Sequence, residues 1–249
     1  MSLVLGLDLG GSSIKAGAVD VKAGHVVGEL ESVPTPEGAS PQATRAALAA
    51  LVARFPQCRG PVGLAFPSVI RAGVAYTAAN IDKRWIGASV QQLLSEAAGR
   101  PGFAVNDADA AGVAEMRTGA GRGELGAVMM LTFGTGIGSA LFAGGQLWRN
   151  SELGHVEFGG REAEHIASAR VRAEEHLDWP AWCERVNRVL AGLDALLWPD
   201  LYIIGGGVSE RFEEFGALLR SHARIVPAEL RQTAGVVGAA FFAAEHPSG

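Results

Sequence analysis

Cysteine and basic residues are both scarce in this sequence. Only two cysteines occur among 249 residues, Cys58 and Cys183, and they lie far apart and form no CxxC pair. Such a chain offers neither a disulfide framework nor a zinc knuckle, and it fits a reducing cytoplasm. Lysine and arginine number 21 against 26 acidic residues, which gives a formal net charge of −5. This balance argues against nucleic acid as a partner, although a local basic cleft could still bind an anionic substrate.

Long apolar runs are absent too. No apolar stretch reaches membrane-spanning length without a charge or a glycine, so we expect no membrane partner. The first residues, MSLVLGLDLGG, lack the basic segment of a signal peptide, and Asp8 interrupts their apolar run. Hydrophobic residues nevertheless make up 48% of the chain and charged residues 19%, which is enough apolar material for a large core. We therefore expect a folded cytoplasmic protein.

Two common nucleotide-binding motifs are missing as well. The chain has no GxxxxGK[ST] loop, and its glycine-rich turns lead into strands rather than into the helix that follows GxGxxG in a dinucleotide-binding fold. P-loop NTPases and dinucleotide-dependent oxidoreductases are both disfavoured. What the chain does have is glycine, 34 residues of it, clustered at the ends of apolar runs, where phosphate-binding turns are found.

A strand, a glycine turn and a second strand occur twice, in LGLDLGGSSIKAGAVD (5–20) and in MLTFGTGIGSALFAGG (130–145). Each copy opens one half of the chain, which indicates an internal repeat; the alternative is chance recurrence in a glycine-rich α/β protein. The hydrophobic pattern predicts helices at 42–55, 89–98, 108–116, 162–173, 182–197, 210–221 and 235–245. It predicts strands at 3–9, 14–19, 26–31, 62–66, 103–105, 127–132, 139–142 and 201–204.

The two glycine turns are suited to bind a phosphate chain, because glycine lets backbone N–H groups approach anionic oxygens closely. Ser12, Ser13 and Thr135 add hydroxyl donors, and Lys15 could add positive charge. A carboxylate beside phosphates is repelled unless a cation lies between them, so Asp8 indicates Mg²⁺ held mainly through water. The alternative for Asp8 is a turn-capping role. The run Gly205-Gly206-Gly207 fits either a nucleotide packed against backbone or a tight strand-to-helix turn.

Asn106 and Asp107 lie where a short strand ends and an alanine-rich helix begins. Asp107 could serve only as the helix N-cap, but Asp109 can do the same work, so Asp107 is not required for that role. A sugar hydroxyl is a poor nucleophile, and a carboxylate within hydrogen-bond reach can take its proton as the bond to phosphorus forms. The Asn106 amide offers a donor and an acceptor, which suits vicinal hydroxyls.

Glu152 and His155 flank a glycine turn in the segment after the second repeat, and Glu164 follows downstream. Carboxylates and an imidazole are good partners for sugar hydroxyls. The alternatives are a Glu/His metal site or plain surface polarity, but no cysteine and only one histidine lie close by, which argues against zinc. The remaining histidines lack such a constellation and are interpreted as ordinary surface or core residues: His25, His165, His176, His222 and His246.

Taken in order, these segments resemble the ROK family (repressor, open reading frame, kinase) of the actin-like ATPase superfamily, and within it the polyphosphate glucokinases. The resemblance covers nearly the whole chain. It rests on the two glycine-turn segments and on TAANIDKRWIG (77–87), VNDADAAGVAE (105–115), SELGHVEFGGREAE (151–164) and IIGGGVSE (203–210).

The resemblance implies a two-lobed α/β fold of the actin-like ATPase (ribonuclease H-like) type, each lobe a mixed sheet flanked by helices. Residues 1–108, completed by a C-terminal helix at about 236–249, would form the small lobe, and 109–235 the large one. A homodimer is also implied. Gly159 to Ala167 replace the cysteine-rich zinc motif of many members, so no zinc is expected. Pro67-Ser68 stands where members usually have Pro-Gly, and no helix-turn-helix domain fits before the first glycine turn.

The implied activity is phosphoryl transfer to the 6-hydroxyl of glucose from polyphosphate, ATP or both, with Asp107 as the base. The alternatives are an ATP-dependent kinase for mannose, fructose or an amino sugar, and a sugar-sensing protein without catalysis. Sugar contacts are assigned to Asn106, Glu152, His155, Glu164, Pro67, Ser68 and Asn80. Donor contacts are assigned to Asp8, Gly10, Gly11, Ser12, Ser13, Lys15, Thr132, Gly134, Thr135, Gly136, Gly205, Gly206 and Gly207. From the residues alone, candidates to bind a long polyphosphate are Lys15, Lys83, Arg84, Arg122, Arg149 and Arg161; the alternative for most of them is an ordinary solvent-exposed charge.

Overall fold

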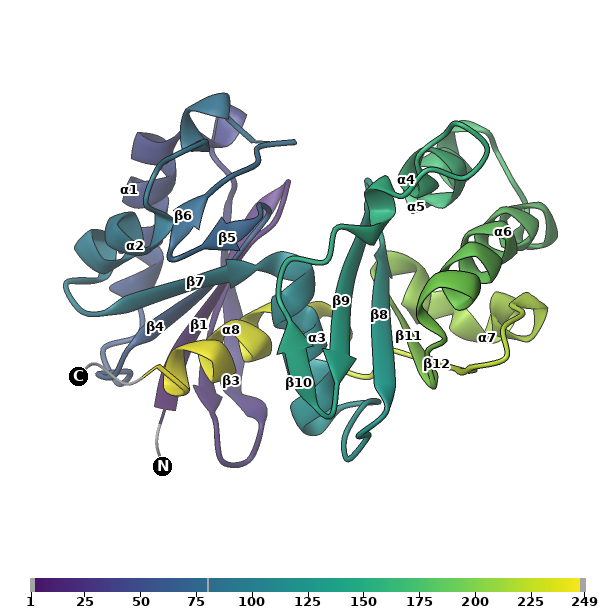
Figure 1. Cartoon of the computed structure of the whole chain (residues 1–249). Helices are drawn as coiled ribbons and strands as arrows, with labels where there is room; N and C mark the ends of the chain where they lie inside the picture. Colours follow the sequence, from purple (N-terminus) through teal and green to yellow (C-terminus); the bar gives the residue numbers. More distant parts are fainter. Residues whose placement is uncertain (1–2, 80, 247–249) are drawn as a thin grey trace. The chain divides into compact units, whose positions relative to one another are not determined.

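The computed structural model describes residues 3–79 and 81–246. The chain divides into two units, which we call the first and the second (Figure 1). The first unit comprises Met1–Ala114 and Gln232–Gly249, and the second comprises Glu115–Arg231. The chain therefore passes from one unit to the other inside helix α3 (Asp107–Thr118) and returns just before helix α8 (Ala234–Ala244). The lobe boundaries drawn from the sequence, at residues 108 and 235, remain a prediction.

The first unit is built on a five-stranded sheet of order β3-β2-β1-β4-β7. Its strands are β1 (Leu3–Leu9), β2 (Ser13–Asp20), β3 (His25–Pro34), β4 (Val62–Phe66) and β7 (Gly102–Asn106). Neighbouring β1, β2 and β3 run antiparallel, whereas β1, β4 and β7 run parallel to one another. All residues of β4 are buried, because helices cover both faces of the sheet.

Helices α1 (Pro41–Val52) and α2 (Val90–Ala98) pack together over one face of this sheet. Each begins at a serine whose side chain accepts a backbone N–H of the first turn: Ser40 from Ala43 at 3.4 Å, and Ser89 from Gln92 at 3.1 Å. Helix α8 packs against β1, β4 and β7 on the opposite face, where Ala65, Val105 and Phe242 form a small core.

Glycines let α8 lie directly on the sheet backbone. A Cβ added to Gly63 would overlap the carbonyl group of Ala239 and lie 3.1 Å from the nitrogen of Ala240. A Cβ at Gly6 would likewise meet the carbonyl of Val236, and its distance to that carbonyl carbon would be 2.9 Å. Neither neighbour is a flexible side chain, so the helix itself would have to move to make room.

Replacing Gly63 with alanine is therefore expected to lower the free energy of unfolding by about 3 kcal/mol, because it forces α8 away from the sheet. Urea unfolding followed by circular dichroism measures the change. Gly60→Ala is the matched control, because an added Cβ at Gly60 meets nothing within 4 Å. An equal loss in both variants would contradict the close packing of α8.

The second unit has a five-stranded sheet of order β10-β9-β8-β11-β12. Its strands are β8 (Ala127–Phe133), β9 (Ile137–Ala143), β10 (Gln146–Trp148), β11 (Leu201–Gly205) and β12 (Arg224–Pro227). Here β8, β9 and β10 are antiparallel neighbours, and β8, β11 and β12 run parallel. Order and direction match the first sheet strand for strand, which confirms the internal repeat that the two glycine turns indicate.

The long helix α6 (Trp179–Leu197) supplies much of the second core. Asp178 caps its first turn by accepting the N–H of Ala181 at 2.9 Å. Trp182, fully buried, packs edge-on against Phe133 of β8 and Phe215, with ring centroids 5.3 and 5.2 Å apart. The other helices of this unit are α4 (Ala163–Ala167), α5 (Ala169–Glu174) and α7 (Phe212–Phe215).

Short elements complete the described part of the chain. A small hairpin pairs β5 (Ile70–Arg71) with β6 (Val74–Ala75). The 3₁₀ helices are η1 (Glu37–Ala39), η2 (Lys83–Trp85), η3 (Leu153–His155), η4 (Gly207–Arg211), η5 (Gly216–Leu218) and η6 (Arg231–Thr233). None of the helices within residues 3–79 and 81–246 has the length and apolar character needed to cross a bilayer.

Two helices expected from the sequence are wrong in extent. The helix predicted over 162–173 is two short ones, because Ser168 is extended (ψ 162°) and its hydroxyl accepts the N–H of Val171 at 3.3 Å. A serine inside an apparent helix has here become the cap of a new one. The helix predicted over 210–221 is α-helical only over Phe212–Phe215, with 3₁₀ turns on both sides. Strand β12 and the β5–β6 hairpin were missed.

Candidate active site

In the first unit, the proposed catalytic groups lie at one edge of the sheet. The register pairs Asp8 of β1 with Ala65 of β4, and Phe66 of β4 with Asn106 of β7. Because these strands are parallel, their carboxyl ends meet at the same edge. Asp8, the Pro67-Ser68 pair and the Asn106-Asp107 pair therefore gather there, as three segments far apart in the sequence.

The first glycine turn, residues 10–12, is held from one side and open on the other. Gly10 donates its N–H to the carbonyl of Ser13 at 3.0 Å. Thr35, which follows β3, donates its N–H to the carbonyl of Ser12 at 3.0 Å and its hydroxyl to the carbonyl of Gly10 at 2.6 Å. Gly11 and Ser12 are exposed. Thr35 is a structural partner that sequence reasoning missed, because it lies 25 residues from Gly10 along the chain, just after β3.

Asp8 lies half-buried beside this turn, and its surroundings fit a cation-binding role. Burial raises the pKa of the Asp8 carboxyl, and the positive charge of Lys15, its neighbour on β2, acts in the opposite direction. Helix α8 begins close by, since a Cβ on Gly235 would lie 2.6 Å from the Asp8 Cγ atom. Water solvates this half-buried carboxylate poorly, so a divalent ion would stabilise its ionised form. Carboxylate oxygens are ligands that Mg²⁺ prefers, and the residues present therefore fit Mg²⁺.

Asn106, and not Asp109, caps helix α3, which corrects the expectation that Asp109 would do this. The Asn106 Oδ1 atom accepts the N–H of Asp109 at 3.0 Å, and its Nδ2 donates to the carbonyl of Ser68 at 3.2 Å. Asp107 is half-buried, and its Oδ1 accepts the N–H of Ala108 at 2.9 Å. The carboxylate of Asp107 is therefore not needed as the N-cap, which is the condition for its proposed chemistry. A sugar contact by Asn106 remains a prediction.

Ser68 and Asn80 were also predicted to contact sugar. Ser68 is buried, and its hydroxyl donates to the carbonyl of Thr77 at 2.8 Å, so its side chain joins two loops of the first unit. Pro67 precedes it and is half-buried. Asn80 lies outside the described residues. The contacts of these residues with sugar remain predictions.

In the second unit, the second glycine turn (residues 134–136) mirrors the first. Gly134 donates its N–H to the carbonyl of Gly136 at 3.0 Å, and Arg170 of α5 donates its N–H to the carbonyl of Gly134 at 3.1 Å. Gly134 and Thr135 are exposed, so the tip of the turn is open to a ligand.

The glycine run 205–207 lies beside this turn at the same sheet edge. Gly205 of β11 is paired with Thr132 of β8. Gly206 has a φ of +80°, and a Cβ there would lie 2.7 Å from the nitrogen of Phe133. Glycine at 206 is thus explained by the packing of two strand ends, the tight-turn alternative. A nucleotide at Gly205, Gly206 and Gly207 remains a prediction.

The segment with Glu152 and His155 is attached to β9. Ser139 accepts the N–H of Leu153 at 3.0 Å, and its hydroxyl donates to the carbonyl of Ser151. A Cβ on Gly154 would overlap the carbonyl of Ile137, so only glycine lets this turn lie on the strand. Burial raises the pKa of the Glu152 carboxyl, and the nearby His155 opposes the rise.

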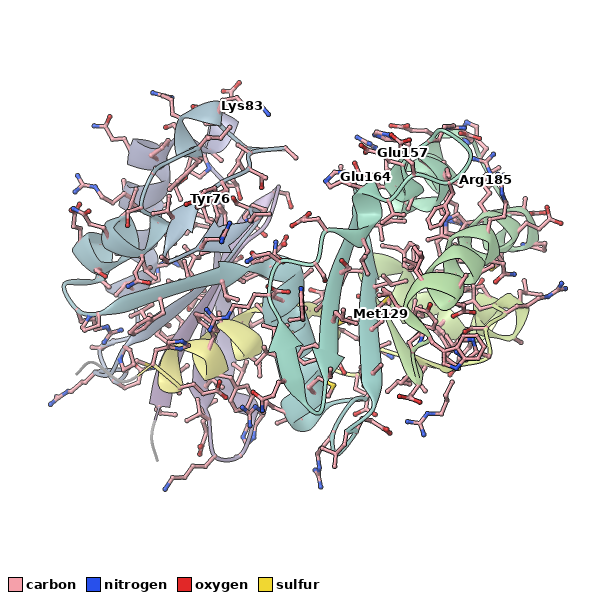
Figure 2. The ribbon with its side chains drawn as sticks, viewed as in Figure 1. Tyr76, Lys83, Met129, Glu157, Glu164 and Arg185 are labelled. Atoms are coloured by element: carbon pink, nitrogen blue, oxygen red, sulfur yellow. The ribbon has the colours of Figure 1, made fainter. Side chains whose placement is uncertain are left out.

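Glu164 lies against the second glycine turn. A Cβ on Gly136 would overlap the Glu164 carboxylate, so the absence of a side chain at 136 leaves room for it. Figure 2 shows Glu164, a residue of α4, at the end of β8 and β9 that carries the turn. The second unit therefore brings one proposed sugar ligand to the proposed phosphate-binding backbone.

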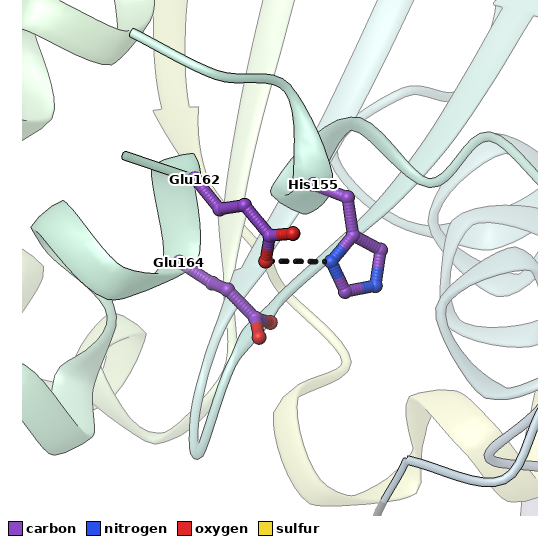
Figure 3. A group of neighbouring side chains, drawn as sticks. All are labelled: His155, Glu162 and Glu164. Carbon is purple, nitrogen blue, oxygen red and sulfur yellow. Dashed lines mark hydrogen bonds and ion pairs between the residues drawn. The ribbon is translucent and has the colours of Figure 1, made fainter. Parts of the chain in front are cut away.

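Figure 3 shows His155, Glu162 and Glu164 converging, with the Nδ1 atom of His155 3.1 Å from Oε2 of Glu162. That hydrogen bond is the main reason why the pKa of His155 is raised, and Glu164 and Glu152 add to it. Glu162 is a neighbour that sequence reasoning missed. The nitrogens of His165, interpreted from the sequence as an ordinary residue, lie 3.7 Å from Glu162 and 3.7 Å from Glu164. Ligand atoms of the three residues in Figure 3 lie within 4.8 Å of one another, a spacing that could also hold a cation.

Comparison with known proteins shows which solved structures this chain resembles. The fold has close relatives of known structure, among them an inorganic polyphosphate/ATP-glucomannokinase from Arthrobacter sp. strain KM. That protein is 44% identical, with a TM-score of 0.94, over 99% of this chain and 100% of the other. A ROK family glucokinase from Streptomyces griseus, solved with glucose and AMPPNP, is 26% identical with a TM-score of 0.80 over 98% and 99% of the two chains. The actin-like ATPase fold expected from the sequence is confirmed.

The family follows from the sequence comparison. The ROK family model matches residues 4–169. A polyphosphate glucokinase from Mycobacterium tuberculosis is 45% identical over 236 residues, which is 94% of this chain and 89% of that protein. The chain belongs to the ROK family.

Proposed function

We propose that this protein is a glucokinase that transfers a phosphoryl group from polyphosphate or ATP to the 6-hydroxyl of glucose. The observation that carries the proposal is the edge of the first sheet, where Asp8 and Asp107 lie at the ends of parallel strands beside an open glycine turn. The relatives named for polyphosphate and glucose support the choice of substrates.

In the proposed reaction, the oxygen of the sugar 6-hydroxyl attacks the terminal phosphorus of the donor, and Asp107 takes the proton of that hydroxyl. The bond between that phosphorus and its bridging oxygen breaks, and the electron pair leaves with the shortened polyphosphate or with ADP. Glu152, His155 and Glu164 hold the other hydroxyls. Backbone N–H groups of the two glycine turns bind the donor. Most of the rate enhancement then comes from positioning and from stabilising charge on the transferring group.

Asp8 would hold Mg²⁺, mainly through water. Bound Mg²⁺ supplies positive charge that offsets the negative charge of the phosphates. The half-buried Asp8 carboxylate, whose pKa is raised by burial, supplies oxygen donors whose chemistry fits the ion.

A donor panel tests the proposed function directly. We expect glucose 6-phosphate to form from both ATP and polyphosphate, because an open glycine turn binds phosphates by backbone N–H groups and requires no nucleoside. Steady-state rates with ATP and with polyphosphates of several defined lengths, each with Mg²⁺, are the measurement. Glucose binding without phosphorylation by any donor would instead support a sugar-sensing protein.

Mannose is a second acceptor that a specific observation favours. The relative from Arthrobacter, at 44% identity, is described as a glucomannokinase. The donor panel repeated with mannose, fructose and an amino sugar decides among the acceptors.

A homodimer in the cytoplasm belongs to the same proposal, and a monomer mass in light scattering would contradict the dimer.

A further inference from the structure

Glu162 is brought to His155 by a small hairpin of the second unit. Ala163 donates its N–H to the carbonyl of Val156 at 2.9 Å, and Phe158 donates to that of Arg161 at 2.8 Å. The two residues at the tip, Gly159 and Gly160, have φ values of +64° and +79°. Two successive positive φ angles define the type I′ turn that glycine favours. The turn reverses the chain within two residues and returns Glu162 to the neighbourhood of His155.

The hairpin is anchored to the long helix α6. Phe158 packs against the second core, and a Cβ on Gly192 of α6 would lie 2.6 Å from the Phe158 Cζ atom. Gly192 therefore provides the space that the ring fills. Glu162 occupies the N-cap position of α4, but its side chain makes no capping hydrogen bond. The hairpin thus positions the Glu162 carboxylate, which does not cap helix α4.

We propose that Glu162 is a positioning residue for the acceptor sugar: by accepting a hydrogen bond from Nδ1 of His155, it orients the ring so that Nε2 is presented to a hexose hydroxyl. An ionised carboxylate can only accept, so Nδ1 must carry the proton and Nε2 remains available. Nε2 lies on the side of Glu152, 3.9 Å from its Oε2. The inference rests on the proposed function, because it assumes that His155 and Glu152 contact sugar.

The carboxylates that act on the ring within the described residues are those of Glu152, Glu162 and Glu164, and His165 lies beside the last two. Three carboxylates lie near the imidazole of His155, which is 48% exposed, so charge alone leaves the orientation of the ring open. The shortest contact selects one partner, because Glu162 Oε2 lies 3.1 Å from Nδ1 whereas Glu152 Oε2 lies 3.9 Å from Nε2. This hydrogen bond requires a proton on Nδ1 of His155. A cation bound to Nδ1 would displace that proton, so experiment can distinguish the two states.

Nitrogen NMR of the full-length protein without sugar tests the hydrogen bond by itself. The protein has six histidines, and ¹⁵N-histidine labelling with His155→Gln assigns the ring of interest. We expect neutral His155 to carry its proton on Nδ1 in the wild type. In Glu162→Ala the proton should move to Nε2, whereas Glu162→Gln, which keeps an acceptor oxygen, should retain the Nδ1–H form in part. An unchanged tautomer in Glu162→Ala would overturn the proposal.

Glucose kinetics test the consequence for the sugar. Glu162→Ala should raise KM for glucose about tenfold, the usual worth of one hydrogen bond to a charged group, with a much smaller change in kcat. Glu162→Gln should recover most of the loss. Glu157→Gln is the matched control, because Glu157 is exposed and lies opposite Glu162 in the hairpin backbone; its KM should equal that of the wild type.

His155→Gln separates the failure of this inference from the failure of the proposed function. If KM rises in His155→Gln but not in Glu162→Ala, the role of Glu162 is wrong and that of His155 stands. If neither variant raises KM, the assignment of His155 to sugar fails, and the inference fails with it even where NMR finds the hydrogen bond. One equivalent of zinc in the purified protein, lost in Glu162→Gln, would overturn the inference in favour of a metal site.

Discussion

Replacing Asp107 with asparagine should lower kcat for glucose phosphorylation about a thousandfold, within the range that a general base contributes, and leave KM for glucose almost unchanged. Asparagine has the same shape and can still accept the N–H of Ala108, which is 2.9 Å from Oδ1 in the wild type. What it cannot do is take a proton from the attacking hydroxyl. A coupled assay for glucose 6-phosphate gives both constants, and calorimetry with glucose checks that binding survives.

Asp178→Asn is the control for Asp107→Asn. Asp178 also lies at the start of a helix, where its Oδ1 accepts the N–H of Ala181 at 2.9 Å. Loss of its charge should leave kcat and KM at wild-type values. Turnover of Asp107→Asn near that of the wild type would remove Asp107 from the mechanism and, with it, the main chemical support for the proposed kinase.

Replacing Asp8 with asparagine should lower kcat about a hundredfold and weaken the apparent affinity for Mg²⁺, as expected when a charged group beside the transferring phosphate is neutralised. Raising the Mg²⁺ concentration should recover part of the activity, because asparagine keeps one oxygen. Rates measured over a series of Mg²⁺ concentrations, with ATP and with polyphosphate, give the result. Normal Mg²⁺ dependence in Asp8→Asn would contradict the assignment of the ion to this residue.

Stability should change in the opposite direction to activity in Asp8→Asn. Burial raises the pKa of Asp8 in the folded protein, so the folded state binds its proton more tightly than the unfolded state does. The stability that this group contributes is therefore present below its unfolded pKa and is lost as pH rises through the folded value. Above that folded pKa the ionised carboxylate destabilises the fold, and there asparagine should leave the free energy of unfolding equal or higher.

Asp20→Asn gives the reverse pattern and serves as the control. Asp20 is paired with Leu3, at the opposite end of the β1–β2 ladder from Asp8, and hydrogen bonds from the backbone of Lys22 and Ala23 lower its pKa. Its contribution to stability is present above the unfolded pKa and is lost as pH falls through the folded value. Asp20→Asn should therefore lose some stability at neutral pH and keep its kinetics. A loss of both stability and activity in Asp8→Asn would indicate misfolding.

Local signals account for the parts of the site that the sequence determined by itself. Each glycine turn lies between two apolar strands in an uninterrupted segment, and Asp8 and Asp107 follow directly on such strands. A strand that ends at a polar residue delivers that residue to the edge of its sheet, whatever the rest of the fold does. The family motifs are made of these same short segments, so the fold class was accessible from them.

Contacts between distant segments were decided only by the tertiary structure. Thr35 reaches the first glycine turn because β3 pairs with β2, and Gly235 reaches Asp8 because α8 packs on the sheet; neither pairing is encoded nearby. Asn106 displaced Asp109 as the cap of α3 because its amide also bonds to Ser68, from another loop. Glu162 reaches His155 through a turn whose register depends on two positive φ angles and on a phenylalanine seated against α6. Strand and helix periodicity report only which face of an element is apolar, whereas partners across a turn or a sheet depend on packing that the whole chain determines.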